Sequence, residues 1–148
     1  MSYTNMLCHI VIRTKYSRPT ITATYERDLY AYIYAYTKAM GCWVHRIGGM
    51  PDHVHILIDI PTTVTLSDLM RGMKTTTSKR LKEWRDRFPA FEGWEKEYYA
   101  CSVSPRYVEA VKQYIMNQKE HHKKKDSRTE LIELCRENGI DIDERYIL

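Results

Sequence analysis

The stretch from Cys42 to Ile60 constrains the fold more than any other part of this sequence. A turn cluster, Gly48 to Asp52, separates two runs of strand-forming residues, which predicts an antiparallel hairpin. Side chains two apart on a strand share a face. The second run therefore has one apolar face, which indicates the core side of a half-buried strand and consists of Val54, Ile56, Ile58 and Ile60.

Strands and helices alternate along the rest of the chain. The expected elements are a strand over residues 7–14, a helix over 24–40, the hairpin, a helix from Thr65 or Ser67 to about Phe88-Pro89, a strand over 98–103, and a helix from Ser104-Pro105 to about Lys125. The order βαββαβ followed by a helix predicts an α+β, ferredoxin-like fold with an added C-terminal helix and tail. This fold serves nucleic-acid-binding, metal-binding and enzymatic proteins alike, so it does not decide function.

The length and composition fit one compact domain with a tail. The chain has 148 residues, of which 43% are hydrophobic, enough for one core with little room for a second. We expect the domain to cover residues 1–125 and a helical tail to cover residues 126–148. The tail contains a short amphipathic helix that closes at Asn138-Gly139. Its apolar side must be covered, either by its own domain or by a second subunit.

Several features argue against membrane insertion and secretion. No apolar run approaches the roughly 20 residues of a membrane span, and the first residues lack a basic region followed by an apolar one. We therefore expect a cytoplasmic protein. Its cysteines are scattered without paired spacing, so we expect buried thiols rather than a zinc ribbon or a disulfide framework; they are Cys8, Cys42, Cys101 and Cys135.

The start of the second hairpin strand carries two histidines, His53 and His55, on the face opposite its apolar residues. Because both rings project from one face, they can offer nitrogen atoms to a single divalent cation. A pair of partly exposed, hydrogen-bonded imidazoles with no metal is the other interpretation of this pattern.

A tyrosine and a glutamine, Tyr114 and Gln118, are one helical turn apart in the last major helix. Side chains at this spacing lie next to each other, so one can attack a substrate while the other binds a metal. Without further information, Tyr114 is equally well explained as a packing residue at the edge of the core.

Several segments together resemble the single-tyrosine HUH transposases of bacterial insertion sequences, and the resemblance extends over nearly the whole chain. It is carried mainly by residues 48–58, with their glycines, aspartate and His-Val-His motif, by residues 98–104, and by the Tyr114 to Gln118 segment. The first strand and the basic residues 73–80 also fall where this family has equivalent segments. Residues 120–122 and the ending 138–146 are similar to the REP-associated tyrosine transposase branch.

The resemblance implies a metal-dependent tyrosine DNA endonuclease and strand transferase, that is, a transposase. Tyr114 would be the catalytic nucleophile, and His53, His55 and Gln118 would bind Mg²⁺ or Mn²⁺. Attack of the phenol on a phosphodiester would leave a 5′-phosphotyrosine and a free 3′-hydroxyl, which conserves the bond for rejoining. The sequence does not identify a general base.

The predicted second helix is basic and suits a single-stranded or hairpin DNA partner. Its best candidates for phosphate contacts are Arg71, Lys74, Lys79 and Arg80. A solvated helix face with ordinary salt bridges is the alternative explanation for these charges. From the resemblance alone, we also expect a homodimer.

Two other functions were weighed. A domesticated, non-catalytic protein that binds single-stranded or hairpin DNA on the same fold is the main alternative, although such a protein has no need for all four predicted site residues. A phosphodiesterase acting on small nucleotides would need a second histidine motif, and His9 and His45 are isolated.

Overall fold

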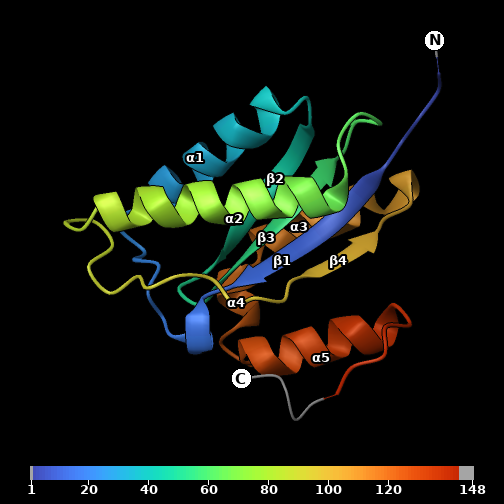
Figure 1. Ribbon diagram of the computed structural model, residues 1–148. Helices are drawn as coiled ribbons and strands as arrows, with labels where there is room; N and C mark the ends of the chain where they lie inside the picture. Colours follow the sequence, from blue (N-terminus) through green and yellow to red (C-terminus); the bar gives the residue numbers. More distant parts are fainter. Residues whose placement is uncertain (1, 144–148) are drawn as a thin grey trace.

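The structure is a computed structural model that describes residues 2–143. A four-stranded antiparallel sheet forms its centre, with the strand order β2-β3-β1-β4 (Figure 1). The strands are β1 (Leu7–Arg13), β2 (Trp43–Met50), β3 (His53–Asp59) and β4 (Tyr99–Ser102). This order and the intervening helices confirm the predicted α+β, ferredoxin-like fold.

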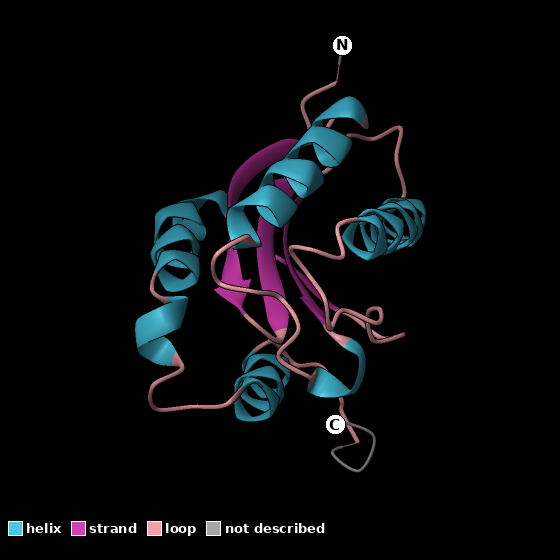
Figure 2. Ribbon diagram, turned by 90° about the vertical axis from the view of Figure 1, so that its left-hand side faces the viewer, coloured by secondary structure: helices cyan, strands magenta, loops and turns pink. Residues whose placement is uncertain are grey.

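Helices cover both faces of the sheet (Figure 2). On one face lie α1 (Glu26–Ala39) and α2 (Leu66–Glu83), and on the other lie α3 (Val108–Met116), α4 (Gln118–His121) and α5 (Ser127–Glu137). Two short 3₁₀ helices, η1 (Lys15–Ser17) and η2 (Pro105–Tyr107), follow β1 and precede α3. The sheet is therefore buried on both sides.

The two faces of β3 have different chemistry, as its alternating sequence predicted. Val54, Ile56 and Ile58 are fully buried in the main core beneath α1 and α2. Burial of side chains of this size stabilises the fold by about 1.5–3 kcal/mol each. His53 and His55 alternate with them and so project towards α3, α4 and α5. The apolar packing thus orients the histidine pair towards the second layer of helices.

The predicted C-terminal end of α2 is wrong. The helix ends at Glu83 instead of near Phe88, and Trp84 leaves the helical conformation with ψ of 55°. The guanidinium groups of Arg80 and Arg87 lie 4.7 and 4.6 Å from the centre of the Trp84 ring. Cation–π stacking and the ring contact with Phe88 stabilise a turn where the pattern alone predicted another helical turn.

The continuous helix predicted up to about Lys125 is also wrong. It is divided at Asn117, whose ψ of 16° separates α3 from α4, and it ends at His121. The division leaves Tyr114 and Gln118 close together, with the Gln118 side-chain nitrogen 3.4 Å from the Tyr114 carbonyl oxygen. Gln118 is buried at the start of α4 and contacts β3 through His53.

The tail helix α5 docks on its own domain. Asp126 caps its first turn by accepting a hydrogen bond from the Thr129 amide, and Gly139 follows its end with φ of +69°. Its apolar side packs against Val11 and Tyr99 of the sheet. The apolar side of the tail helix is therefore covered by its own chain, which was one of the two alternatives, the other being a second subunit. Residues 144–146, part of the resemblance to the REP-associated branch, lie outside the described residues.

Two further expectations concern membranes and cysteines. Among the described residues, no helix is long and apolar enough to span a membrane. All four cysteines are free thiols, and Cys8, Cys42 and Cys135 are buried while Cys101 is partly exposed. The predicted lack of disulfide bonds thus holds in the structure.

Gly49 permits the close approach of β2 and β3 next to the histidines. A Cβ atom at this position would lie 2.3 Å from the carbonyl oxygen of His53, a contact that requires the backbone to move. We expect Gly49→Ala to lower the free energy of unfolding by about 2 kcal/mol or more, measured by urea denaturation. Gly48→Ala is the comparison variant. Its Cβ would lie 3.0 Å from the Ile115 side chain and 3.2 Å from the Ile115 carbonyl oxygen, so we expect a smaller loss than for Gly49→Ala, and an equal loss in both variants would contradict this explanation.

Candidate functional site

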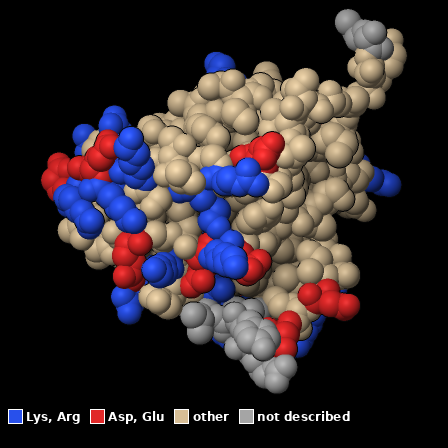
Figure 3. Space-filling view, viewed as in Figure 1, with Lys and Arg blue, Asp and Glu red and all other residues tan. Residues whose placement is uncertain are grey.

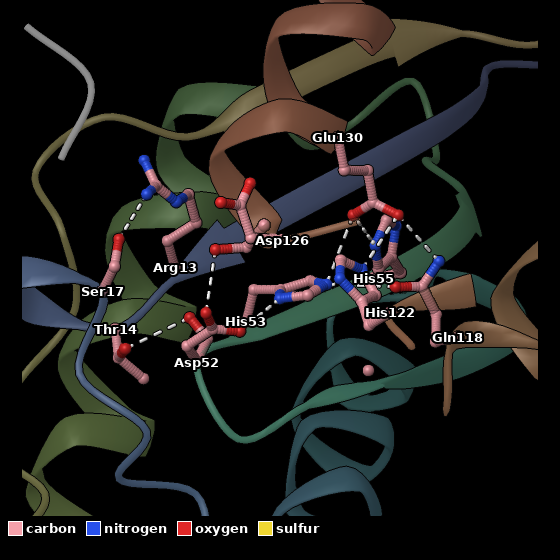
Figure 4. A network of polar contacts seen from close by, with 12 residues as sticks. Arg13, Thr14, Ser17, Asp52, His53, His55, Gln118, His122, Asp126 and Glu130 are labelled. Atoms are coloured by element: carbon pink, nitrogen blue, oxygen red, sulfur yellow. Dashed lines mark hydrogen bonds and ion pairs between the residues drawn. The ribbon is translucent and has the colours of Figure 1, made fainter. Parts of the chain in front are cut away.

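The two histidines of β3 form the centre of a buried polar cluster beneath α4 and α5 (Figure 4). Both are fully buried and hydrogen-bonded, so the partial exposure assumed in the alternative interpretation is wrong. Nε2 of His53 lies 3.1 Å from the side-chain oxygen of Gln118. Three of the predicted site residues therefore meet, although 65 positions separate His53 from Gln118 along the chain.

Glu130 of α5 connects the cluster and was not predicted from the sequence. Its side chain is almost completely buried, and its Oε1 atom lies 2.9 Å from Nε2 of His55 and 3.3 Å from Nε2 of His53. Its Oε2 atom accepts hydrogen bonds from the Tyr114 hydroxyl at 2.5 Å and the Gln118 amide at 3.0 Å. One carboxylate thus contacts all four residues predicted for the site.

A second group of residues orients the two histidines from behind. Nδ1 of His53 lies 2.7 Å from Asp52, whose other carboxylate oxygen accepts a hydrogen bond from Ser127 at 2.8 Å. Nδ1 of His55 lies 2.8 Å from Nε2 of His9 on β1. Because both Nδ1 atoms are occupied in this way, both Nε2 atoms point to Glu130, which is the arrangement that holds imidazole ligands in metal sites.

The cluster contains separated charges. Burial alone would lower the pKa of His53, but hydrogen bonds with Asp52 and Glu130 outweigh it and raise that pKa to about 9. Burial would raise the pKa of Glu130, yet the surrounding histidines hold it well below its usual range. At neutral pH, Glu130 is therefore a carboxylate that faces an imidazolium at His53.

His55, His9 and Tyr114 are neutral groups of this cluster. Burial lowers the pKa of His55, although its hydrogen bond with Glu130 opposes this, and burial lowers the pKa of His9 to about 3. Burial, together with the hydrogen bond to Glu130, raises the pKa of the Tyr114 phenol. The phenol consequently keeps its proton and donates a hydrogen bond to Glu130 in this arrangement.

The donor atoms of the cluster suit a hard divalent cation. One ligand atom each from His53, His55 and Glu130 lies within 4.8 Å of the others. Neighbouring ligand atoms around an octahedral cation, at bond lengths of about 2.1 Å, lie roughly 3 Å apart. The spacings of Glu130 Oε1 from the two imidazole nitrogens, 2.9 and 3.3 Å, agree with this value.

Two histidines after α3 complete the surroundings of Glu130. Nε2 of His122 lies 3.2 Å from Glu130 Oε2, and Nε2 of His121 lies 3.5 Å from both that atom and the Tyr114 hydroxyl. From the sequence, these histidines were part of the resemblance and of a basic run that was interpreted either as a phosphate contact or as a helix C-terminus. Their proximity to Glu130 arises because the chain turns after α4 and brings the N-terminal part of α5 over β3. His121 is near Tyr114 because the two residues are seven positions apart, about two helical turns.

Comparison with known proteins gives the family. Residues 2–118 match the protein family described as "Transposase IS200 like", a match that spans most of the chain. The chain belongs to the IS200-like transposase family. No curated protein matches it. As an IS200-like transposase, it carries its four predicted site residues within the matched region, whereas Glu130 lies beyond it.

Two solved structures are similar to this IS200-like transposase in fold. One is a protein assigned as a transposase from Deinococcus radiodurans R1, with a TM-score of 0.62 and 21% identity, covering 79% of this chain and 93% of that one. The other is a REP-associated tyrosine transposase bound to a REP hairpin, with a TM-score of 0.63 and 13% identity, covering 82% of this chain and 72% of that one. At these identities the likeness shows a shared fold, so membership of the REP-associated branch stays a prediction.

The predicted DNA contacts of this transposase lie away from the histidine cluster. All four are on α2, which covers the opposite face of the sheet, and Figure 3 shows basic and acidic side chains intermixed near the C-terminal end of that helix. Arg71 pairs with Asp68, and Arg80 pairs with Glu83 and stacks on Trp84. Lys74 donates a hydrogen bond to the Lys96 carbonyl oxygen, and Lys79 is exposed. Their role in DNA binding stays a prediction.

The contact between Asp52 and His53 allows a test of the orienting residues. We expect Asp52→Asn to weaken Mn²⁺ binding by about 10-fold, because it removes the charge that keeps the Nδ1 proton of His53 in place. Calorimetric titration of the variant with Mn²⁺ measures this effect. Asp86→Asn changes an exposed aspartate after α2 and should leave the affinity unchanged. Equal affinities in the Asp52 variant and the wild-type protein would contradict the orienting role.

Proposed function

We propose that this IS200-like transposase nicks and rejoins single-stranded DNA through a 5′-phosphotyrosine at Tyr114, with a divalent metal bound by His53, His55 and Gln118. The observation that carries the proposal is the meeting of the phenol and both imidazoles at one carboxylate within a single chain. The Tyr114 hydroxyl lies 2.5 Å from one oxygen of Glu130, and Nε2 of His55 lies 2.9 Å from the other. Because this point is buried beneath α5, a phosphate would reach it only when α5 moves away from β3, and it would then be within reach of the phenol and the imidazoles.

The proposed metal is Mg²⁺ or Mn²⁺. Two imidazole nitrogens favour Mn²⁺, whereas amide and carboxylate oxygens suit both ions. We propose that Glu130 adds its Oε1 atom to the His53, His55 and Gln118 set, and that His53 would lose its Nε2 proton when the cation binds. When bound, the cation would offset the charge of the scissile phosphate and orient it.

The residues of the chain then have separate tasks. Asp52 and His9 hold the two imidazoles so that their Nε2 atoms face inwards. Tyr114 attacks phosphorus in line with the leaving 3′-oxygen, so one phosphorus–oxygen bond forms and one breaks. Glu130 Oε2, which accepts the phenolic hydrogen bond, would orient the Tyr114 hydroxyl, and the proton that Tyr114 releases would pass to water.

The proposed substrate is single-stranded DNA or a DNA hairpin. A structurally similar protein is a REP-associated tyrosine transposase bound to a REP hairpin, which supports a substrate of this kind. An attack from a helix-mounted tyrosine also requires a backbone that can bend, as single strands do. We propose that Arg71, Lys74, Lys79 and Arg80 contact phosphates of the stem, at a distance from the cleaved bond.

The proposal is tested by adduct formation. The protein is incubated with labelled single strands of the DNA that flanks its gene, with Mn²⁺ or Mg²⁺, and separated on a denaturing gel. We expect a labelled protein band that needs the metal and disappears with EDTA. Binding without an adduct, under either metal, would favour the non-catalytic DNA-binding protein.

We propose that the active form is a homodimer. Because α5 covers its own domain, the tail does not require a second subunit. Sedimentation at micromolar concentration should give about twice the 17.6 kDa of one chain. A single 17.6 kDa species, with and without hairpin DNA, would contradict the dimer.

A further inference from the structure

A cavity beside Tyr114 lies outside the histidine cluster. It has a volume of about 490 Å³ and is lined by β4, α3 and the C-terminal end of α5. His9 and Tyr99 of the sheet line it together with Tyr107, Tyr114 and Asn138. Among residues 2–143, its lining contains no lysine or arginine and one carboxylate, that of Glu137. Such a lining does not attract a phosphate group.

The cavity instead has the chemistry of a site for a planar, uncharged ring. Tyrosine and histidine rings form part of its surface, and Ser102, Ser104 and Asn138 bring hydroxyl and amide groups. Aromatic faces with a few polar groups bind nucleobases by stacking and by hydrogen bonds at their edges. The lining therefore favours a base over the sugar-phosphate backbone.

The cavity and the histidine cluster share two side chains. Tyr114 lines the cavity, and its hydroxyl contacts Glu130 of the cluster at 2.5 Å. His9 also lines the cavity, while its Nε2 lies 2.8 Å from His55. The ring centres of His9 and Tyr114 are 6.1 Å apart. A strand with a phosphate at the cluster would therefore bring a neighbouring nucleotide to the cavity.

Tyr107 is the ring best placed to stack on an incoming base. Its side chain is 55% exposed, whereas Tyr99 is buried and Tyr114 is engaged with Glu130. The guanidinium of Arg106 lies 5.7 Å from the Tyr107 ring centre, which adds a cation on the outer side of this ring. Tyr107 belongs to η2 and has no contact with the histidine cluster among the described residues.

We infer that this cavity binds the base of a nucleotide adjoining the scissile phosphate, with Tyr107 as its stacking platform. The inference rests on the proposed function, because it places that phosphate at the histidine cluster. It adds a protein site that reads or holds one base of the cleaved strand. Tyr107 would be a positioning residue, since it holds the nucleotide without touching the reacting atoms.

The first experiment measures stacking without requiring cleavage. A single-stranded oligonucleotide from the DNA flanking the gene carries the fluorescent base 2-aminopurine at successive positions. With wild-type protein and Tyr107→Phe, we expect the emission to be quenched at one position, and with Tyr107→Ala this quenching should be lost. Tyr34→Ala, at an exposed tyrosine on α1, is the matched control and should behave like wild type.

The second experiment measures the effect on the reaction. In the wild-type protein, an abasic site next to the cleaved bond should slow adduct formation by about 10-fold, the order expected for loss of one base–aromatic stack. With Tyr107→Ala, adduct formation on the intact strand should be about 10-fold slower than with wild type. The abasic site should then slow adduct formation by this variant by less than about 2-fold.

The outcomes separate the two ideas. If no adduct forms but quenching depends on Tyr107, the cleavage proposal fails and the base site stands. If adducts form while quenching and the abasic penalty are the same in Tyr107→Ala as in wild type, the base site is overturned and the cleavage proposal stands.

Discussion

Replacing Tyr114 with phenylalanine is expected to abolish the covalent DNA adduct, with a loss of about 10³-fold or more in cleavage. The substitution keeps the ring that packs against the small cluster of Leu7, Leu57 and Ile115 and removes only the attacking oxygen. It also removes one donor to Glu130, which retains the Gln118 amide and the histidines. The fold should therefore persist. The measurement is adduct formation on a denaturing gel with labelled single-stranded DNA.

Tyr34→Phe is the matched control for this experiment. Tyr34 is an exposed tyrosine of α1, on the opposite layer of the protein, and the loss of its hydroxyl should leave cleavage unchanged. An adduct that still forms with Tyr114→Phe would show that another residue is the nucleophile. Circular dichroism of both variants verifies that neither has lost its fold.

Replacing His55 with glutamine is expected to have the second largest effect. The rate of metal-dependent cleavage should fall by more than about 100-fold. The Nε2 atom of His55 faces Glu130, and its ring is held in place by the contact with His9. The glutamine side chain cannot keep both interactions. Glutamine remains polar, so Glu130 keeps a hydrogen-bonding neighbour and the loss of stability should be limited. Calorimetric titration with Mn²⁺ should also show weaker binding.

His45→Gln is the control for this prediction, since His45 lies on β2 beside a register shift and away from the cluster. It should change neither cleavage nor metal affinity. If His55→Gln lowers the melting temperature while its Mn²⁺ affinity and cleavage equal those of wild type, His55 is a structural histidine and the metal proposal is wrong.

The strand pattern and the helix boundaries show how far local sequence information extends. The face of β3 was predictable because alternation along a strand is set by backbone geometry, which Val54, Ile56 and Ile58 follow without exception. The end of α2 was mispredicted because the apolar spacing continues past Glu83. There the stacking of Arg80 and Arg87 on Trp84 decides the conformation. The spacing of apolar residues does not indicate this contact.

The candidate site divides in the same way. His53, His55, Tyr114 and Gln118 were found from their spacing and from the family resemblance, and the structure brings them together within one chain. Their catalytic and metal-binding roles stay proposals. Asp52 was noted as part of the turn and of the family resemblance, and His9 as an isolated histidine of the first strand. Neither was assigned a role at the site, because their contacts with the site histidines depend on side-chain orientation and, for His9, on the pairing of β1 with β3.

What the sequence alone determined was therefore the four strands, the first two helices and their order, together with the apolar face of β3, because these follow from the conformational preferences of neighbouring residues. The tertiary structure decided that the tail helix folds back over β3 and that Glu130 enters the histidine cluster, 75 positions from His55. Contacts at such separation depend on the packing of α5 against the sheet, and a single acidic residue on a helix has no local signal that distinguishes burial from exposure to solvent.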